Sequence, residues 1–343
     1  MKKLLPIFSL SFFIFIIGFF YFLNNNKKPI IYEEKYYKFG TIVSIKISEL
    51  PDKPQKDIES IFNNVGVLIN ELHIKWHPWE QNSNNVLYNL NLALQNGKSY
   101  EVDKDTLNII RTSKYIAELT DNLFNPINGR LYEIWGFHKE DFSKNKIPDK
   151  KLINEVISAK LTMNNIEINE NIISTNIKNP KIRKLIKLDF NAIAKGQIIL
   201  NIKKLLVDNG INNALINIGG DIHAMGYKDF NNKSKWTSAI FNPNDNNTPI
   251  KVINLKPNQS IATSGNYFRK FEKNNRNYHH IINSISGISQ NKIKQVSIIH
   301  DNPLISDAIA TAIMASNNYN KNDFKQLDYK YLVITNNKIY SNL

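Results

Sequence analysis

The sequence of 343 residues contains no cysteine. This absence excludes disulfide bonds, thiolate metal sites, a cysteine nucleophile and a lipid-modified N-terminal cysteine. The G-x-G-x-x-G fingerprint of dinucleotide-binding folds is also missing. His73 and His77 have the spacing of a zinc-binding pair, but the glutamate of the H-E-x-x-H motif is absent and Pro78 follows at once. We therefore expect neither a Rossmann fold nor a zinc site at this pair.

Acidic residues are fewer than basic ones: 30 Asp and Glu stand against 44 Lys and Arg, a formal net charge of +14. This excess suits an anionic partner such as a phosphate ligand, an acidic protein or a membrane surface. The lysines are spread along the chain, and no basic block is interleaved with aromatic residues. Nucleic-acid binding is therefore not expected.

An apolar run covers residues 4–23, with lysines at positions 2, 3, 27 and 28 on its two sides. The run is about long enough to span a bilayer and longer than a usual signal-peptide core, and no small-x-small cleavage site follows it. We expect residues 1–29 to form an uncleaved signal anchor, with a cleaved signal peptide as the alternative. Residues 30–343 are expected to form the functional domain.

The spacing of apolar residues predicts both helices and strands, without a regular βαβ alternation. We expect helices over residues 58–76, 103–120, 152–160, 198–206 and 306–315, and a short helical piece over residues 83–91. Strands are expected over residues 36–47 with an interruption at Gly40, over 166–177 paired with 181–189, and over 214–218, with mainly strands and turns over 235–299. This order predicts an α+β fold in which helices pack on an antiparallel sheet.

Residues 188–196, with the sequence L-D-F-N-A-I-A-K-G, lie between an expected strand and an expected helix. Asn191 is a good N-cap candidate, and the first turn of a helix offers free N–H groups and partial positive charge to a phosphate. Lys195 adds a full charge in that turn. Asp189, at the strand end, can accept hydrogen bonds from a ligand or from a neighbouring loop. The alternative is a capped turn with a solvated lysine.

Asp307 and Thr311 lie four residues apart on an alanine-rich helix, so their side chains share a face. A carboxylate and a hydroxyl are hard oxygen ligands, which suit Mg²⁺. The alternative is a solvated aspartate near a helix start, where the helix dipole favours it.

Three further stretches could approach a ligand. The glycines of residues 219–221 follow an apolar strand and either admit a ligand or make an ordinary tight turn. Residues 261–265, followed by Tyr267 and Arg269, could cradle a charged group, or could be a strand that runs into a turn. His279 and His280 precede an apolar pair, where a histidine is either catalytic or structural.

In this order, these stretches resemble the ApbE family, the FAD:protein FMN transferases. The resemblance covers roughly residues 36–315. Its elements are residues 39–41, Trp79 with Ser83 and Asn89, residues 124–129 leading to 135–137, residues 188–196, 214–222, 261–265, 280–282 and 307–311. Phe39 replaces the usual Met of the family, Asn125 and Asn283 replace the usual Asp, and residues 284–287 replace P-R-T-G. The two changes from Asp to Asn remove charge near the presumed site.

The resemblance implies a duplicated T-fold-like architecture and Mg²⁺-dependent transfer of FMN from FAD to a Thr or Ser hydroxyl of an acceptor protein, with release of AMP. It implies that Mg²⁺ is held by the Ala192 carbonyl, Asp307 and Thr311. The residues that it implies around FAD are Phe39, Trp79, Phe124, Asn125, Pro126, Asp189, Lys195 and Ile281. Asp307, Lys195 and His280 are the candidate catalytic residues, and the choice between Asp307 and His280 as the proton acceptor stays open.

Acceptors in this family are flavin subunits of membrane redox pumps of the Nqr and Rnf types, which face the outside of the membrane. The resemblance therefore implies a catalytic domain on the periplasmic side of a bacterial inner membrane, held by one N-terminal anchor. Two alternatives are an FAD pyrophosphatase that yields FMN and AMP, and a non-catalytic flavin-binding protein. Asp307 and Thr311 argue against the second alternative, because storage needs no metal.

Overall fold

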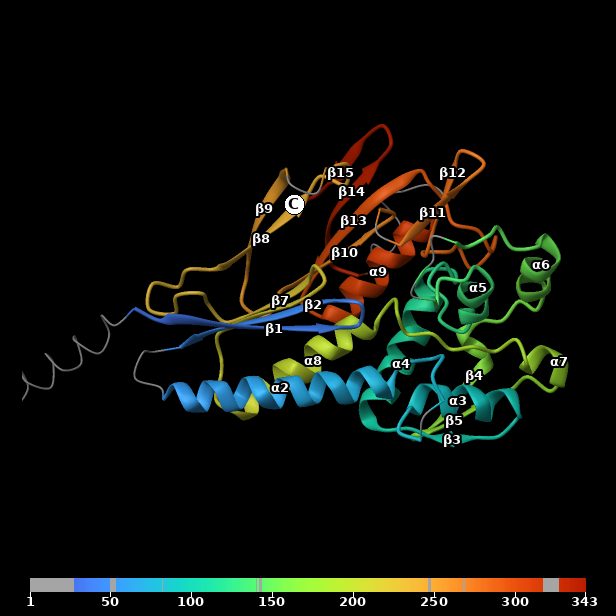
Figure 1. Ribbon diagram of the computed structural model, residues 1–343, viewed down its shortest axis with the longest axis horizontal. Coiled ribbons are helices and arrows are strands. Elements are labelled where there is room, and N and C mark those ends of the chain that lie inside the picture. Colours follow the sequence, from blue (N-terminus) through green and yellow to red (C-terminus); the bar gives the residue numbers. More distant parts are fainter. Residues whose placement is uncertain are drawn as a thin grey trace, which may run out of the picture.

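A computed structural model of the chain describes residues 28–49, 54–81, 83–139, 141, 144–245, 248–267, 269–316 and 327–343. Its centre is a sheet with the strand order β1-β2-β6-β7-β10-β13-β14-β15, in which every neighbouring pair is antiparallel (Figure 1). These strands are β1 (Ile30–Lys38), β2 (Thr41–Glu49), β6 (Ala214–Ile218), β7 (Asp221–Met225), β10 (Ser260–Gly265), β13 (Ile293–His300), β14 (Lys330–Thr335) and β15 (Ile339–Ser341). The predicted α+β fold with an antiparallel sheet is confirmed.

Three smaller sheets flank the large one. They are formed by β3 (Tyr100–Glu101) with β5 (Ile172–Thr175) and β4 (Ile166–Asn169), by β8 (Trp236–Phe241) with β9 (Pro249–Leu255), and by β11 (Lys270–Lys273) with β12 (Arg276–His279). The helices are α2 (Gln55–Lys75), α3 (Val86–Gln95), α4 (Lys104–Leu119), α5 (Gly129–Ile134), α6 (Lys150–Ser158), α7 (Pro180–Arg183), α8 (Ala194–Asp208) and α9 (Pro303–Ala315). A single 3-10 turn, η1 (Met163–Asn165), precedes β4. Each helix expected from the sequence is present, with its ends shifted by a few residues.

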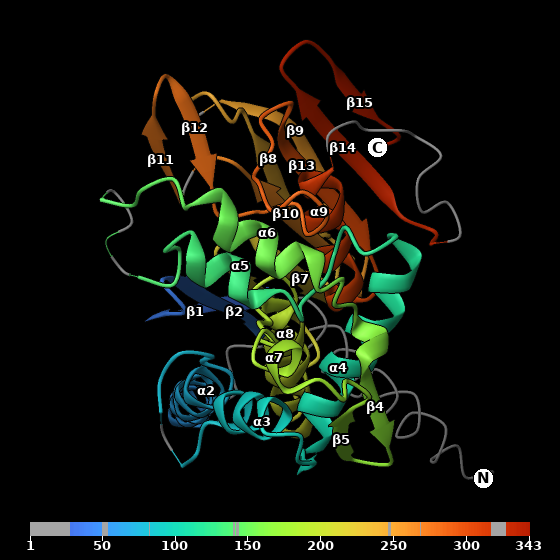
Figure 2. The same cartoon turned by 90° about the vertical axis from the view of Figure 1, so that its right-hand side faces the viewer.

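The helices α8 and α9 occupy the middle of the molecule, with α2 and α3 on one side and the β11–β12 hairpin on the other (Figure 2). α9 packs against β10 and β13, and α8 packs against α9 and β6. Neighbouring side chains of β13 point to opposite faces of the sheet. Ile298 lies in the main core beneath the helices, and Ile299 lies in a second core under the β8–β9 hairpin. The sheet is therefore covered on both faces.

The predicted strand over residues 36–47 is wrong, because two strands run through this region. β1 and β2 form a hairpin with a two-residue turn at Phe39 and Gly40, which have φ angles of 58° and 67°. Positive φ angles at both turn residues are typical of a type I′ turn, whose backbone twist matches the right-handed twist of the flanking strands. Gly40, which the sequence marked as an interruption, is thus where the chain reverses.

The predicted strand over residues 181–189 is also wrong. The Asn179 side chain accepts a hydrogen bond from the Lys181 N–H, and Pro180 occupies the first turn of the short helix α7. An asparagine at the N-cap and a proline at the first helical position both favour a helix. This preference prevails here over the alternation of apolar and basic residues, which favours a strand. The following segment is extended but makes only one bridge with the described residues, from Lys187 to Asn128, and β4 pairs with β5 instead.

Asn191 is not the N-cap of α8. That helix begins at Ala194, with Ile193 at the cap position and no side-chain cap bond. The Asn191 N–H instead donates to Asp189 Oδ1 over 2.9 Å. The turn that was expected before the helix is therefore stabilised by the side chain of Asp189, at the beginning of the turn.

Within the described residues, none of the helices combines the length and the apolar character that crossing a bilayer requires. Of the predicted anchor, residues 1–29, the part from 1 to 27 lies outside the described residues.

Candidate active site

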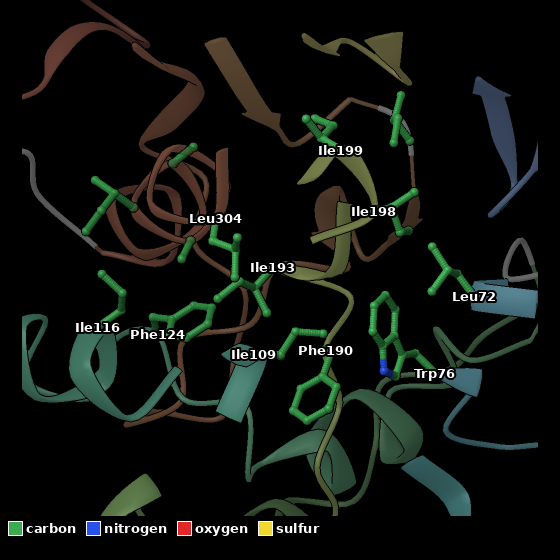
Figure 3. Close-up of a cluster of buried hydrophobic side chains, with 14 of the residues drawn as sticks. Leu72, Trp76, Ile109, Ile116, Phe124, Phe190, Ile193, Ile198, Ile199 and Leu304 are labelled. Carbon is green, nitrogen blue, oxygen red and sulfur yellow. The ribbon is translucent and has the colours of Figure 1, made fainter. Parts of the chain in front are cut away.

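The first turns of α8 and α9 meet at Gly196. A Cβ atom at this position would lie 2.6 Å from both Leu304 Cα and the Pro303 carbonyl oxygen, so only glycine permits the contact. Ile193 and Leu304 lie next to each other in the core beside it (Figure 3). The close approach brings Lys195, in the first turn of α8, to Asp307 of α9.

The Lys195 ammonium lies between two buried carboxylates. Its Nζ contacts Asp221 Oδ2 and is 3.0 Å from Asp307 Oδ1. Asp221 and Asp307 are 2% and 1% exposed, whereas 30% of the Lys195 side chain remains accessible. Burial opposes the charge on Lys195, but the two carboxylates raise its pKa. The expected phosphate-binding lysine therefore already has two negative partners.

Asp221 is a site residue that the sequence did not assign. Gly219 and Gly220, with φ angles of 59° and 99°, form the predicted tight turn between β6 and β7. This turn places Asp221 at the start of β7, where its Oδ1 accepts the Thr263 N–H over 3.0 Å. An aspartate directly after a glycine pair at a strand end was the signal that could have found it.

Asp307 is 1% exposed, so the alternative of a solvated aspartate near the start of a helix is wrong. Burial raises its pKa to about 6, although the Lys195 charge opposes the shift. Its Oδ2 is buried and has no hydrogen-bond partner among the described residues. Thr311 lies one turn further along α9, with its Oγ1 3.2 Å from Ser264 Oγ. Asp307 and Thr311, four positions apart, thus present a buried carboxylate oxygen without a partner among the described residues and a hydroxyl from the same face of α9.

These groups fit a hard cation such as Mg²⁺, because an unpaired buried carboxylate oxygen and a hydroxyl are oxygen donors. Over the part of the chain that the structure describes, no three His, Cys, Asp or Glu side chains gather as they would in a site made of protein side chains alone. A cation here would therefore need backbone or substrate oxygens as further ligands. Ala192 lies in the turn just before α8, three residues before Lys195.

Asp189 lies beside the loop of residues 124–129. It is 8% exposed, and its N–H donates to the Pro126 carbonyl over 2.9 Å. A Cβ at Gly129 would lie 2.8 Å from the Asp189 Cβ, so this glycine lets the loop close onto the segment. Burial raises the pKa of Asp189, although the hydrogen bond from Asn191 opposes the shift.

Trp79 and Tyr132 form an aromatic wall beside this segment. Their rings are stacked, with centroids 6.2 Å apart and planes inclined by 14°. Lys187 Nζ lies 4.5 Å from the Trp79 ring centroid, and Arg269 Nη1 donates to Tyr132 Oη over 3.1 Å. The wall, with a cation over one ring, can receive a flat aromatic group. The sequence did not assign Tyr132 or Lys187.

The remaining residues implied around FAD lie in different surroundings. Phe39, in the hairpin turn, packs edge-on against His73 with centroids 5.3 Å apart. Phe124 is 2% exposed and lies in the main core (Figure 3). Asn125 donates to the Leu161 carbonyl over 2.9 Å, and its Oδ1 is buried without a partner among the described residues. Ile281 is 6% exposed. Of these residues, Phe39 and Asn125 are partly exposed, whereas Phe124 and Ile281 are buried.

The two adjacent histidines have different surroundings. His279 is fully buried: its Nδ1 accepts the Ile281 N–H, and its Nε2 contacts the Gln290 carbonyl, which makes it structural. His280 is half-buried, and its Nδ1 lies 3.3 Å from the Arg269 carbonyl. Burial lowers the pKa of His280 to about 3, so the ring is neutral at physiological pH.

A sequence model of the ApbE family matches residues 39–329. The chain belongs to the ApbE family. Among curated proteins, the chain is 28% identical over 281 residues to a protein of Rhodobacter capsulatus named FAD:protein FMN transferase. The matched residues make up 82% of this chain and 50% of that protein. The chain is 25% identical over 279 residues to the protein of the same name from Vibrio cholerae, covering 80% of this chain and 78% of that one.

This chain thus spans only about half the length of the Rhodobacter capsulatus relative. Among solved structures, the ApbE protein of Thermotoga maritima matches with a TM-score of 0.76 at 24% identity, over 91% of this chain and 97% of that chain. The flavin transferase ApbE of Vibrio cholerae matches with a TM-score of 0.76 at 22% identity, over 91% of this chain and 97% of that chain. At these identities the likeness shows that the fold is shared.

Proposed function

We propose that this ApbE-family chain transfers FMN from FAD to a Thr or Ser hydroxyl of an acceptor protein and releases AMP. The names of the curated relatives support a transfer of FMN from FAD to protein. The observation that carries the proposal is the cluster at the start of α8, where Asp307 has a buried oxygen without a partner among the described residues beside Lys195 and Asp221. The stacked rings of Trp79 and Tyr132 are a second observation that supports it, because they can receive a flat aromatic group.

Asp307, Thr311 and the Ala192 carbonyl would hold Mg²⁺, which supplies neutralisation of phosphate charge when bound. Lys195 holds the Asp221 and Asp307 carboxylates in fixed positions, so their negative charge is partly balanced before a phosphate arrives. The wall of Trp79 and Tyr132 binds and orients the flavin ring. Positioning and charge stabilisation are the main demands of phosphoryl transfer, and these residues supply both.

In the proposed reaction, the acceptor oxygen forms a bond to the FMN phosphorus while the bond from that phosphorus to the bridging oxygen breaks. AMP leaves with the bridging oxygen, and the hydroxyl proton must be taken up. His280 and Asp307 are the candidates for this uptake. Burial lowers the pKa of His280 to about 3, which makes its ring a weak base, whereas the pKa of Asp307 is raised to about 6 and lies nearer the working pH.

We further propose that the acceptors are flavin subunits of Nqr- or Rnf-type redox pumps, and that residues 1–29 attach the catalytic domain to the periplasmic face of the inner membrane. Carbonate extraction of membranes and protease treatment of spheroplasts test the attachment. Retention in the membrane with cleavage by external protease supports it, and release by carbonate or protection from protease contradicts it.

Co-expression of the full chain with the flavin-binding domain of such a pump tests the reaction. Transfer predicts a fluorescent acceptor band on a denaturing gel and an acceptor mass increased by one covalently attached FMN. Free FMN and AMP without a labelled acceptor would indicate a pyrophosphatase. Intact FAD bound to the chain, with neither product, would indicate a flavin-binding protein.

A further inference from the structure

Three cations among the described residues lie around the proposed site, and their charges are engaged differently. Lys195 is paired with two carboxylates. Lys187 is 8% exposed and lies over the Trp79 ring, and burial lowers its pKa. Arg269 is half-buried, and it forms no ion pair with a carboxylate in the described part of the chain. Asp189 attracts Arg269 at longer range, but no carboxylate of the described residues pairs with it directly, as Asp221 and Asp307 pair with Lys195.

The guanidinium of Arg269 is held between the β1–β2 hairpin and the aromatic wall. Its Nη1 donates to Tyr132 Oη over 3.1 Å. A Cβ at Gly40 would lie 2.8 Å from Nη2, so the glycine of the hairpin turn leaves the space that the guanidinium occupies. The backbone of Arg269 is held as well, because its carbonyl accepts the His280 N–H over 3.0 Å. The cation is thus fixed at the edge of the wall, next to a candidate catalytic residue.

We propose that Arg269 binds the phosphate groups of the flavin substrate, while Lys195 serves mainly to hold Asp221 and Asp307. This assignment rests on the proposed function, because it takes FAD as the substrate. A guanidinium presents several donors in a planar fork that matches phosphate oxygens, and only one of them is directed at Tyr132. A phosphate at Lys195 would face the two carboxylates that already neutralise it, whereas Arg269 has no carboxylate at ion-pair distance among the described residues and is attracted by Asp189 only at longer range.

The test compares binding of FAD with binding of riboflavin, which has the same ring system and no phosphate. Both are titrated by flavin fluorescence with EDTA present, so metal ions do not contribute. For Arg269→Gln we expect the FAD dissociation constant to rise at least about tenfold, as for the loss of one hydrogen bond to a charged group, and the riboflavin constant to change less than about twofold. Inorganic pyrophosphate should compete with FAD for the wild type and at least about tenfold less well for the variant.

Arg276→Gln is the matched control, because Arg276 lies on β12 over the Tyr278 ring and is exposed. It should leave both constants unchanged. Tyr132→Phe keeps the ring and removes the hydroxyl contact with Arg269, and FAD affinity should change less than about twofold. If Arg269→Gln does not fold by circular dichroism, Arg269→Lys takes its place, with a smaller loss confined to FAD and pyrophosphate.

Equal losses of FAD and riboflavin affinity would overturn the proposal, because Arg269 would then act only by supporting the aromatic wall. Unchanged FAD affinity would overturn it as well. The readout is separate from catalysis: selective loss of FAD binding without FMN transfer by the wild type would support the assignment of Arg269 while removing the proposed function.

Discussion

Lys195 shows how far a single residue can be understood from sequence. The sequence placed it correctly in the first turn of a helix, and the structure adds the two carboxylates that compensate it. Those partners lie 26 and 112 positions away along the chain, so no local pattern could indicate them. Replacing Lys195 should therefore affect stability as well as ligand binding.

We expect Lys195→Met to lower the free energy of unfolding by roughly 2–3 kcal/mol, because it leaves two buried carboxylates without their shared counter-ion. The partial exposure of Lys195 keeps this estimate below that of a fully buried pair. Lys204→Met is the control: Lys204 lies on the same helix and its side chain is 77% exposed. Its effect should stay within about 0.5 kcal/mol. Equal effects of the two changes in urea unfolding would show that the Lys195 pairs contribute no more than surface pairs.

At the scale of elements, the helix α9 is held at both ends. Its start contacts Gly196, and its last carbonyls accept hydrogen bonds from Asn283 Nδ2, over 2.9 Å at Ala315, and from Gln290 Nε2 at Met314. Asn283 Oδ1 also accepts the N–H groups of Ile285 and Ser286, each over 2.9 Å. The Asn283 amide, which sequence comparison treated only as a missing charge, thus joins the loop of His280 to the helix of Asp307.

Asn283→Asp should therefore destabilise the fold by roughly 1–3 kcal/mol at neutral pH, because a carboxylate cannot donate to the Ala315 carbonyl. The difference from the wild type should shrink in acid, where a protonated carboxyl can donate again. Asn291→Asp provides the comparison, since Asn291 Nδ2 bonds the Asn277 carbonyl at an accessible position. A loss in thermal unfolding no larger than that of Asn291→Asp, or one that is independent of pH, would contradict this role.

Helices with a regular spacing of apolar residues could be predicted from the sequence. Segments whose structure depends on pairing with a distant part of the chain could not. The apolar spacing of α2 and α4 gave their approximate bounds, because one face of each contributes to the core. The alternation over residues 181–189 misled, because this segment contacts the loop at Asn128 and not another strand. In the candidate site, local motifs indicated Lys195 and Asp307. The glycine pair before Asp221 was a local signal, whereas no local pattern indicated Tyr132, whose bond with Arg269 joins residues 137 positions apart.

The whole molecule contains buried histidines that should set its behaviour in acid. His223, on β7, is fully buried, and its Nδ1 lies 2.8 Å from the Oγ of Ser260 on β10. Its Nε2 has no hydrogen-bond partner among the described residues. Burial lowers the pKa of His223 to about 3, that of His279 to about 4 and that of His280 to about 3. These rings stay neutral in the folded state, whereas in the unfolded chain they take up protons below about pH 6.5.

The free energy of unfolding should therefore fall as the pH is lowered from about 6.5 towards 4, because the unfolded state binds more protons in this window. Asp307, whose pKa is raised to about 6, and Asp189, whose pKa burial also raises, act in the opposite sense, but they are two groups against three. His223→Asn should make the dependence shallower when urea unfolding is followed at a series of pH values. A wild-type slope in the His223 variant would exclude this histidine as a source of acid sensitivity.

Asp307 provides the most direct test of the account as a whole. The rate at which an acceptor domain gains the mass of FMN is measured over a series of Mg²⁺ concentrations, for the wild type and for Asp307→Asn. The substitution keeps size and removes the charge that a hard cation needs. We expect transfer to collapse at ordinary Mg²⁺, with partial recovery at high Mg²⁺ or Mn²⁺, while FAD binding weakens less than the rate falls. Equal rates with equal Mg²⁺ dependence would contradict the account, because the carboxylate with the buried free oxygen would then have no part in the reaction.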